Sequence, residues 1–144
     1  MREHDETWQR AFGHMKMKGE TERKIHKRIV GYLKTAHPQV RFCSTLDGEK
    51  FGSFQAQAVR ALQWGRGIPD LLIFHPTQLY TGLALEIKKD TVFRKDGKLK
   101  AGEHLAEQQD WLDYFSNIGW CARFGCGFSQ SIDIIDSYFS NNLI

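Results

Sequence analysis

The sequence predicts an α/β domain in which a small mixed β-sheet is flanked by helices. Two short, strongly apolar segments at residues 71–74 and 83–88 are typical of central strands. Segments with helical spacing of apolar residues lie before and after them. The 144 residues fit a single domain with one core. An alternation of helical and strand segments at this length favours a sheet packed between helices.

The first half of the chain is expected to contain two helices and a strand. A helix over residues 20–36 is predicted from four apolar residues at helical spacing: Ile25, Ile29, Val30 and Leu33. Pro38 ends it, because proline disfavours a helical residue before it. Residues 40–45 favour a strand, and residues 54–64 a second helix.

The second half is expected to begin with a hairpin. Residues 71–74 and 83–88 are its two strands, joined through a turn near Gly82. A helix, a strand and a final helix follow over residues 103–117, 119–124 and 129–139. Ser129 or Ser131 is expected to cap the last helix, since serine accepts hydrogen bonds from the first turn.

Residues 1–18 are expected to form an N-terminal arm ahead of one domain over residues 19–144. In this arm Trp8, Phe12 and Met15 recur at helical spacing and predict a short amphipathic helix. Its apolar side would contact either its own domain or a second subunit, and both alternatives stay open.

Composition excludes several classes of protein. No apolar run approaches the roughly 18 residues of a membrane span. The charged start, Met1-Arg-Glu-His-Asp-Glu, lacks the apolar core of a signal peptide, so we expect a cytoplasmic protein. The three cysteines have no metal-type spacing and are expected to be reduced thiols.

Positive charge is concentrated in one expected loop. Between residues 88 and 100 six Lys or Arg side chains face only two Asp. Such a stretch is either a solvated loop or a contact for phosphate, and its composition does not decide between them.

Three charged residues flank the predicted hairpin and suggest its chemistry. Side chains alternate along a strand, so Glu86 and Lys88 share one face while Ile87 points to the other. Asp70 opens the neighbouring strand, and cross-strand neighbours lie about 5 Å apart. Two carboxylates and an ammonium are therefore expected to converge at one end of an apolar sheet.

This combination suits hydrolysis of a phosphodiester bond. Carboxylate oxygens bind Mg²⁺ while leaving positions for water and phosphate, and the metal activates both. Lys88 is placed to orient or deprotonate the attacking water, or to balance charge on the phosphate. The alternative is a surface cluster of salt bridges, which does not explain acidic residues beside strands this apolar.

The motifs resemble a known nuclease family. Gly67-Ile-Pro-Asp70-Leu-Leu-Ile, followed by Leu83-Ala-Leu-Glu86-Ile-Lys88-Lys89, is similar to the VRR-NUC family of PD-(D/E)xK nucleases. Glu22-Arg-Lys-Ile25-His26 resembles an early helix of that family, with His26 in place of its usual Gln. Gln108-Gln-Asp-Trp111 resembles a later helix. The resemblance covers about residues 20–139.

The resemblance implies a restriction-endonuclease-like fold and a structure-selective DNA endonuclease, as in Holliday-junction resolvases that act as homodimers. It implies one or two Mg²⁺ (or Mn²⁺) ions per site. The implied metal ligands are Asp70, Glu86, Glu22 and the backbone carbonyl of Ile87. The implied catalytic residues are Asp70, Glu86, Lys88, Glu22 and Gln108. Free-standing members of this size are bacterial or bacteriophage proteins.

Helical geometry also places Glu22, which precedes Ile29 by seven residues and so lies on the face toward the sheet. Its alternative role is an acid that stabilises the N-terminus of its helix. Gln108 is either close to a metal-bound water or a solvated amide. The residues assigned to DNA contacts are Arg66, Lys89, Arg94 and Lys98.

Other kinds of site are less well supported. Gly125-Cys-Gly127 lacks the third glycine of a dinucleotide-binding turn. The six histidines include no HxH or HExxH pair for zinc, and no nucleophile elbow is present. Two alternatives to a resolvase remain: a monomeric nuclease acting on flaps or nicking, and a catalytically silent DNA-binding module.

Overall fold

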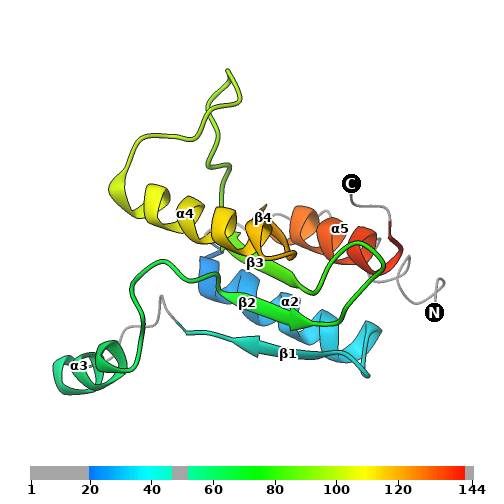
Figure 1. Ribbon diagram of the computed structural model, residues 1–144, viewed down its shortest axis with the longest axis horizontal. Helices are drawn as coiled ribbons and strands as arrows, with labels where there is room; N and C mark the ends of the chain where they lie inside the picture. Colours follow the sequence, from blue (N-terminus) through cyan, green and yellow to red (C-terminus); the bar gives the residue numbers. More distant parts are fainter. Residues whose placement is uncertain (1–19, 47–51, 142–144) are drawn as a thin grey trace.

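The computed structural model describes residues 20–46 and 52–141 (Figure 1). The predicted N-terminal arm lies outside the described residues. The elements, in chain order, are α2 (Glu22–Ala36), β1 (Arg41–Ser44), α3 (Ser53–Ala61), β2 (Leu71–Phe74), β3 (Leu83–Lys88), α4 (Glu103–Asn117), β4 (Cys121–Cys126) and α5 (Phe128–Phe139).

The four strands form one mixed sheet in the order β1-β2-β3-β4. β2 pairs antiparallel with both β1 and β3, whereas β3 and β4 run parallel. A parallel pair needs a crossover connection, and α4 supplies it. The order of helices and strands is the predicted one, and the fold class of a small mixed sheet flanked by helices is confirmed.

Helices cover both faces of the sheet. α2 and α5 pack on one face around the larger core, in which Ile29, Leu85 and Ile135 are fully buried. α4 packs on the other face around a smaller core that includes Ala84 and Phe115. Every residue of β3 except Lys88 is buried, as expected for a central strand covered on both sides.

Two segments project from this body (Figure 1). The loop over residues 91–100 extends beyond the N-terminal end of α4 and is closed by a bridge between Phe93 and Leu99. α3 extends away from the sheet, and none of its residues is buried. The sequence predicted the helix but not its exposed position.

Helix starts differ in part from expectation. Thr21 caps α2 by accepting a hydrogen bond from the backbone N–H of Lys24. α5 begins after Gly127, which makes no side-chain cap, so the predicted serine caps are wrong. Ser131 is buried, and its hydroxyl instead donates to the Gly127 carbonyl at 2.8 Å. The steep turn from β4 into α5 explains this, because Gly127 has a φ of 88°.

Along residues 20–46 and 52–141, none of the helices combines the length and apolar character that crossing a membrane requires.

Candidate active site

The predicted cluster lies where β2 begins and β3 ends. In the β2–β3 ladder Leu71 is paired with Leu85, and Asp70 lies one residue before the strand. The Asp70 carboxylate accepts a hydrogen bond of 2.8 Å from the backbone N–H of Ile87. This side chain thus binds the backbone of β3 just beyond the paired part of the strand, which fixes Asp70 beside Glu86.

Pro69 explains why the ladder stops at this point. The register that pairs Leu71 with Leu85 would place Pro69 opposite Ile87. Proline has no N–H and cannot donate to a neighbouring strand, so it leaves the carbonyl oxygen of Ile87 without a donor from residue 69. The sequence Pro-Asp therefore ends the pairing and supplies a carboxylate at the same place.

Glu86 is the most unusual residue of the cluster, with only 3% of its surface exposed. Its Oε1 accepts a hydrogen bond of 2.7 Å from Nε2 of Gln108 on α4. The Lys88 ammonium lies 3.9 Å from the same oxygen. The other oxygen, Oε2, is buried and has no hydrogen-bond donor within the described part of the chain. A buried acceptor left in this state is costly unless a proton or a cation satisfies it.

The pKa shifts of the two carboxyl groups also indicate that the charged form of Glu86 is not fully compensated. Burial raises the pKa of Glu86 far above its ordinary value, and the neighbouring Asp70 charge raises it further, whereas Lys88 opposes the shift. Burial also raises the pKa of Asp70, against the lowering effect of the Ile87 N–H. One ammonium therefore does not compensate the buried Glu86 and the half-buried Asp70, and the site favours either a proton on Glu86 or an additional cation.

Glu22 reaches this end of the sheet from the first turn of α2. Its Oε2 accepts a hydrogen bond of 3.1 Å from the backbone N–H of Lys89, and its charge contributes to the raised pKa of Glu86. Across residues 20–46 and 52–141 there is no group of three His, Cys, Asp or Glu side chains arranged to hold a metal ion. In this arrangement Glu22 binds the end of β3 rather than joining Asp70 and Glu86 as a third gathered carboxylate.

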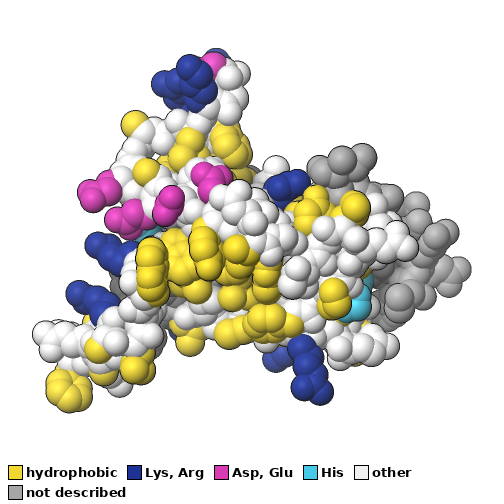
Figure 2. Space-filling view, viewed as in Figure 1, with side chains coloured by type: hydrophobic (Ala, Val, Ile, Leu, Met, Phe, Trp, Pro, Cys, Tyr) yellow, Lys and Arg dark blue, Asp and Glu magenta, His cyan; other side chains and the backbone are white. Residues whose placement is uncertain are grey.

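The predicted basic residues are not all at the carboxylates. Lys88 lies beside Glu86, and Lys89 is exposed next to it. The exposed Arg94 pairs with Asp96 at 2.7 Å in the projecting loop, where Lys98 is also exposed. Figure 2 shows Lys and Arg side chains gathered at the tip of that loop.

Arg66 lies in the connection between α3 and β2. Its backbone carbonyl accepts a hydrogen bond of 2.8 Å from the indole N–H of Trp111, and the residue is exposed.

Two histidines also belong to this region, although sequence reasoning gave them no role. A positive charge on His26 lowers the pKa of Asp70, and its Nε2 is 3.0 Å from the hydroxyl of Ser44. His104 lies 3.1 Å from Nε2 of Gln108. Helical spacing could have located both, because His26 is four residues after Glu22 and His104 four before Gln108.

Comparison with known proteins supports the fold. No family model matches the chain, and no curated protein is significantly similar to it in sequence. A solved structure described as a "VRR_NUC domain protein" superposes with a TM-score of 0.58 and 24% sequence identity, covering 86% of this chain and 92% of that one. The chain therefore has the VRR-NUC type of fold that its motifs predicted.

Proposed function

We propose that the protein is a DNA endonuclease that hydrolyses phosphodiester bonds and depends on Mg²⁺ or Mn²⁺. The observation that carries this proposal is the buried Glu86 with Lys88 and the half-buried Asp70 beside it, where Oε2 of Glu86 has no donor among the described residues. The fold of the VRR_NUC domain protein supports it. A buried carboxylate beside a second acid is costly for folding alone, and strongly perturbed carboxylates cluster at functional sites.

The residues present fit a hard divalent cation. Oxygen ligands are available from Asp70, Glu86 and the Ile87 carbonyl, and these are the donors that Mg²⁺ and Mn²⁺ prefer. Glu22 would join them by releasing the Lys89 N–H or through a water molecule. One or two such cations would supply Lewis-acid activation of water and of a phosphate oxygen.

The chain's own side chains have separate tasks in this proposal. As an ammonium, Lys88 holds a positive charge beside the reacting phosphate and orients the attacking water; only as a neutral amine would it deprotonate that water. Gln108 fixes Glu86 through its 2.7 Å hydrogen bond, so it positions the carboxylate. Phosphates farther along the DNA are bound by Lys89, by Arg66 and by the projecting loop over residues 91–100.

The finer proposal is a structure-selective nuclease for branched DNA, acting as a Holliday-junction resolvase and a C2 homodimer. A two-fold symmetric junction is matched by two sites related by two-fold symmetry. The projecting α3 offers a contact for a second copy, because four apolar residues lie on one side of it: Phe54, Ala58, Ala61 and Leu62. Figure 2 shows apolar side chains over this projecting end.

The size of this α3 face is close to what a dimer needs. An aromatic side chain buries roughly 150–250 Å², so the four residues offer roughly 400 Å² per copy and roughly 800 Å² for two. Specific interfaces bury about 1,000 Å² or more, and residues flanking α3 would supply the remainder.

A cleavage assay tests the proposal. Labelled four-way junction, flap and plain duplex are incubated with Mg²⁺ and wild-type protein or Asp70→Asn. We expect paired incisions in the junction by the wild type alone, with DNA binding by Asp70→Asn retained or improved, because an amide binds Mg²⁺ poorly and removes negative charge facing phosphate.

The other outcomes separate the alternatives. Flap cleavage without paired junction incisions would identify a monomeric flap or nicking nuclease. Binding without cleavage of any substrate by the wild type would identify a silent DNA-binding module. Loss of folding in Asp70→Asn would contradict the assignment of Asp70 to metal binding.

A further inference from the structure

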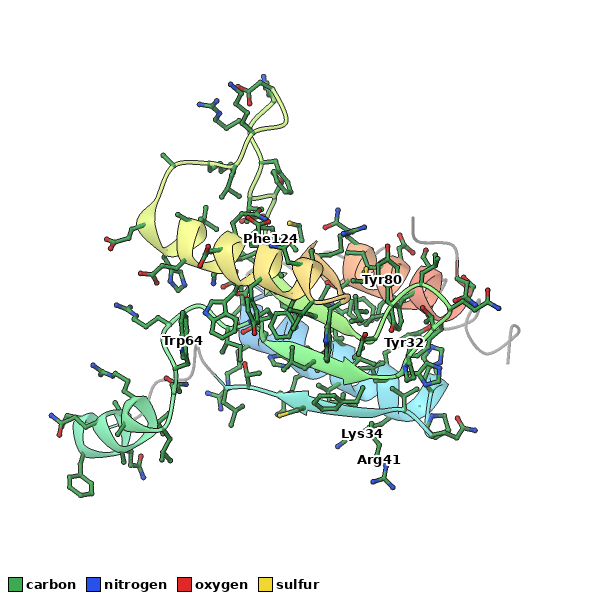
Figure 3. The ribbon with its side chains drawn as sticks, viewed as in Figure 1. Tyr32, Lys34, Arg41, Trp64, Tyr80 and Phe124 are labelled. Atoms are coloured by element: carbon green, nitrogen blue, oxygen red, sulfur yellow. The ribbon has the colours of Figure 1, made fainter. Side chains whose placement is uncertain are left out.

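Trp64 is the most exposed aromatic side chain among the described residues. It lies in the connection between α3 and β2, and 87% of its surface is exposed. Figure 3 shows it where this connection passes the body of the molecule, beside α4. Tryptophan is highly buried on average, so an indole exposed to this extent is available to contact a partner.

The ring of Trp64 is held in place by its edge contact with the body. It meets Trp111 of α4 with ring centroids 5.4 Å apart and planes at 85°. Trp111 is itself fixed, since its indole N–H donates to the Arg66 carbonyl. A ring supported by a perpendicular neighbour keeps a flat face available for stacking.

The connection that carries Trp64 runs beside the turn of α4 that holds Gln108, since a Cβ on Gly67 would lie 3.1 Å from the backbone of Glu107. Trp111 follows Gln108 by three residues on α4, so the two lie one turn apart. Gln108 donates to Glu86 in the cluster. Trp64 therefore contacts the same helix that carries Gln108, the residue that binds Glu86.

Two basic side chains close to Trp64 in sequence suit a nucleic acid as the partner. Arg60 and Arg66 flank it in sequence, and both are exposed. An aromatic face between basic side chains is the combination by which proteins bind unpaired nucleotides, with the ring stacking on the base and the cations on phosphates.

We propose that Trp64 stacks on an unstacked base next to the cleaved phosphodiester bond. This rests on the proposed function and narrows its substrate to DNA with an open base at that position, at a branch point or a boundary between single strand and duplex. In a continuous duplex every base is already stacked on its neighbours, so Trp64 adds nothing to the binding of such DNA.

The test compares three variants with the wild type. Trp64→Ala removes the ring and Trp64→Phe keeps a smaller one. Leu79→Ala is the control, because Leu79 is 61% exposed, has no ring and lies in the connection between β2 and β3, outside the α3 face. Binding is measured in EDTA, to prevent cleavage, with a branched DNA carrying 2-aminopurine at the branch point and with plain duplex. Mass is measured in parallel by light scattering.

We expect Trp64→Ala to bind the branched DNA roughly ten-fold more weakly and to bind duplex as the wild type does, since stacking of one base contributes that much. Stacking quenches 2-aminopurine, so the quenching by wild type should disappear with Trp64→Ala and persist in part with Trp64→Phe. Leu79→Ala should keep both the affinity and the quenching.

Several outcomes would overturn the inference. If Trp64→Ala loses equal affinity for branched and for duplex DNA, the ring contributes to general DNA binding and not to recognition of an open base. If the quenching of 2-aminopurine is unchanged in Trp64→Ala, stacking by this ring is excluded. A lower mass for Trp64→Ala, with unchanged quenching per bound protein, would assign the ring to a protein contact. If wild-type protein binds no branched DNA, the proposed function fails as well; if it binds and cleaves branched DNA and only the Trp64 effects are absent, the proposed function stands without this inference.

Discussion

At the scale of single residues, the surroundings of Glu86 indicate the chemistry of the site most directly. Its charged form is disfavoured by burial and by Asp70, and neither Lys88 nor Gln108 fully compensates for this. A folded protein accepts such an acid only in protonated form or beside a cation. Protonation of Glu86 and metal binding to it should therefore both stabilise the folded protein.

This link predicts how pH affects metal-free protein. Because the folded pKa of Glu86 is raised above the ordinary value of 4.5, the folded state holds the proton more tightly than the unfolded state does. Stability is then fully present below pH 4.5 and is lost as pH rises toward the folded pKa, at up to about 1.4 kcal/mol per pH unit. Glu86→Gln should lose less stability than wild type between pH 5 and pH 8 in EDTA.

Thermal unfolding measures this difference directly. Adding Mg²⁺ at pH 8 should raise the Tm of the wild type and leave Glu86→Gln nearly unchanged. Parallel Tm curves for both proteins across pH would show that Glu86 is not buried with a raised pKa. Equal stabilisation by Mg²⁺ would place the metal elsewhere.

Substitutions of Lys88 and of Lys98 should produce different defects, one in the cleavage rate and the other in DNA binding. Lys88 is beside Glu86, whereas Lys98 is exposed in the projecting loop. Lys88→Ala should lower the single-turnover cleavage rate by 100-fold or more, on the order expected for a lost electrostatic contact, with little change in affinity. Lys98→Ala should weaken binding and reduce its salt dependence by about one unit of slope. The same profile in both variants would mean that Lys88 acts only as part of a basic surface.

At the scale of elements, the hairpin depends on a close approach at Gly82. A Cβ added there would lie 2.5 Å from the ring of Trp120 and 2.7 Å from the carbonyl oxygen of Ile73. The carbonyl belongs to β2 and cannot move without disturbing the sheet. This glycine thus lets the chain enter β3 directly against its neighbour.

A pair of glycine substitutions tests this. Gly82→Ala should destabilise the protein by roughly 1–3 kcal/mol, the usual cost of overpacking. Gly31→Ala is the matched control, because Gly31 lies within α2 and a Cβ there meets nothing within 4 Å. It should stabilise by about 0.5–1 kcal/mol. Chemical denaturation gives both values, and a neutral Gly82→Ala would contradict the packing at this turn.

At the scale of the whole molecule, contacts within one copy of the described chain do not explain the exposed position of α3. Nine residues without a buried side chain do not hold a helix strongly in water, and Phe54 and Leu62 are 85% and 89% exposed. A second copy packed on the α3 face would supply the missing contacts.

The dimer prediction follows from that face. Wild-type protein at micromolar concentration should have the mass of two chains by light scattering, and Phe54→Asp with Leu62→Asp should give a monomer, because charges in an apolar interface are not compensated. Cleavage of a single flap by this double variant should persist, since neither residue contacts the carboxylates. A wild-type monomer would instead favour the monomeric flap or nicking alternative.

Local periodicity determined much of this protein from its sequence. The bounds of β2, β3 and α4 are the predicted ones, because alternation and helical spacing are properties of short segments. The same alternation placed Glu86 and Lys88 on the face opposite Ile87. The close approach of Asp70 to β3 also follows from sequence, since Pro69 ends the strand pairing next to it.

Contacts between distant segments were decided only by the tertiary structure. The structure brings together three pairs of residues that are distant in sequence. Glu22 binds the backbone of Lys89, 67 positions away, and a charge on His26 lowers the pKa of Asp70, 44 positions away. Gln108 donates a hydrogen bond to Glu86, 22 positions away. The projection of α3 is of the same kind: its apolar spacing predicted a helix, but whether a helix packs on its own sheet depends on the space left by the other elements. Sequence periodicity describes which face of a segment is apolar, and only the fold decides what that face meets.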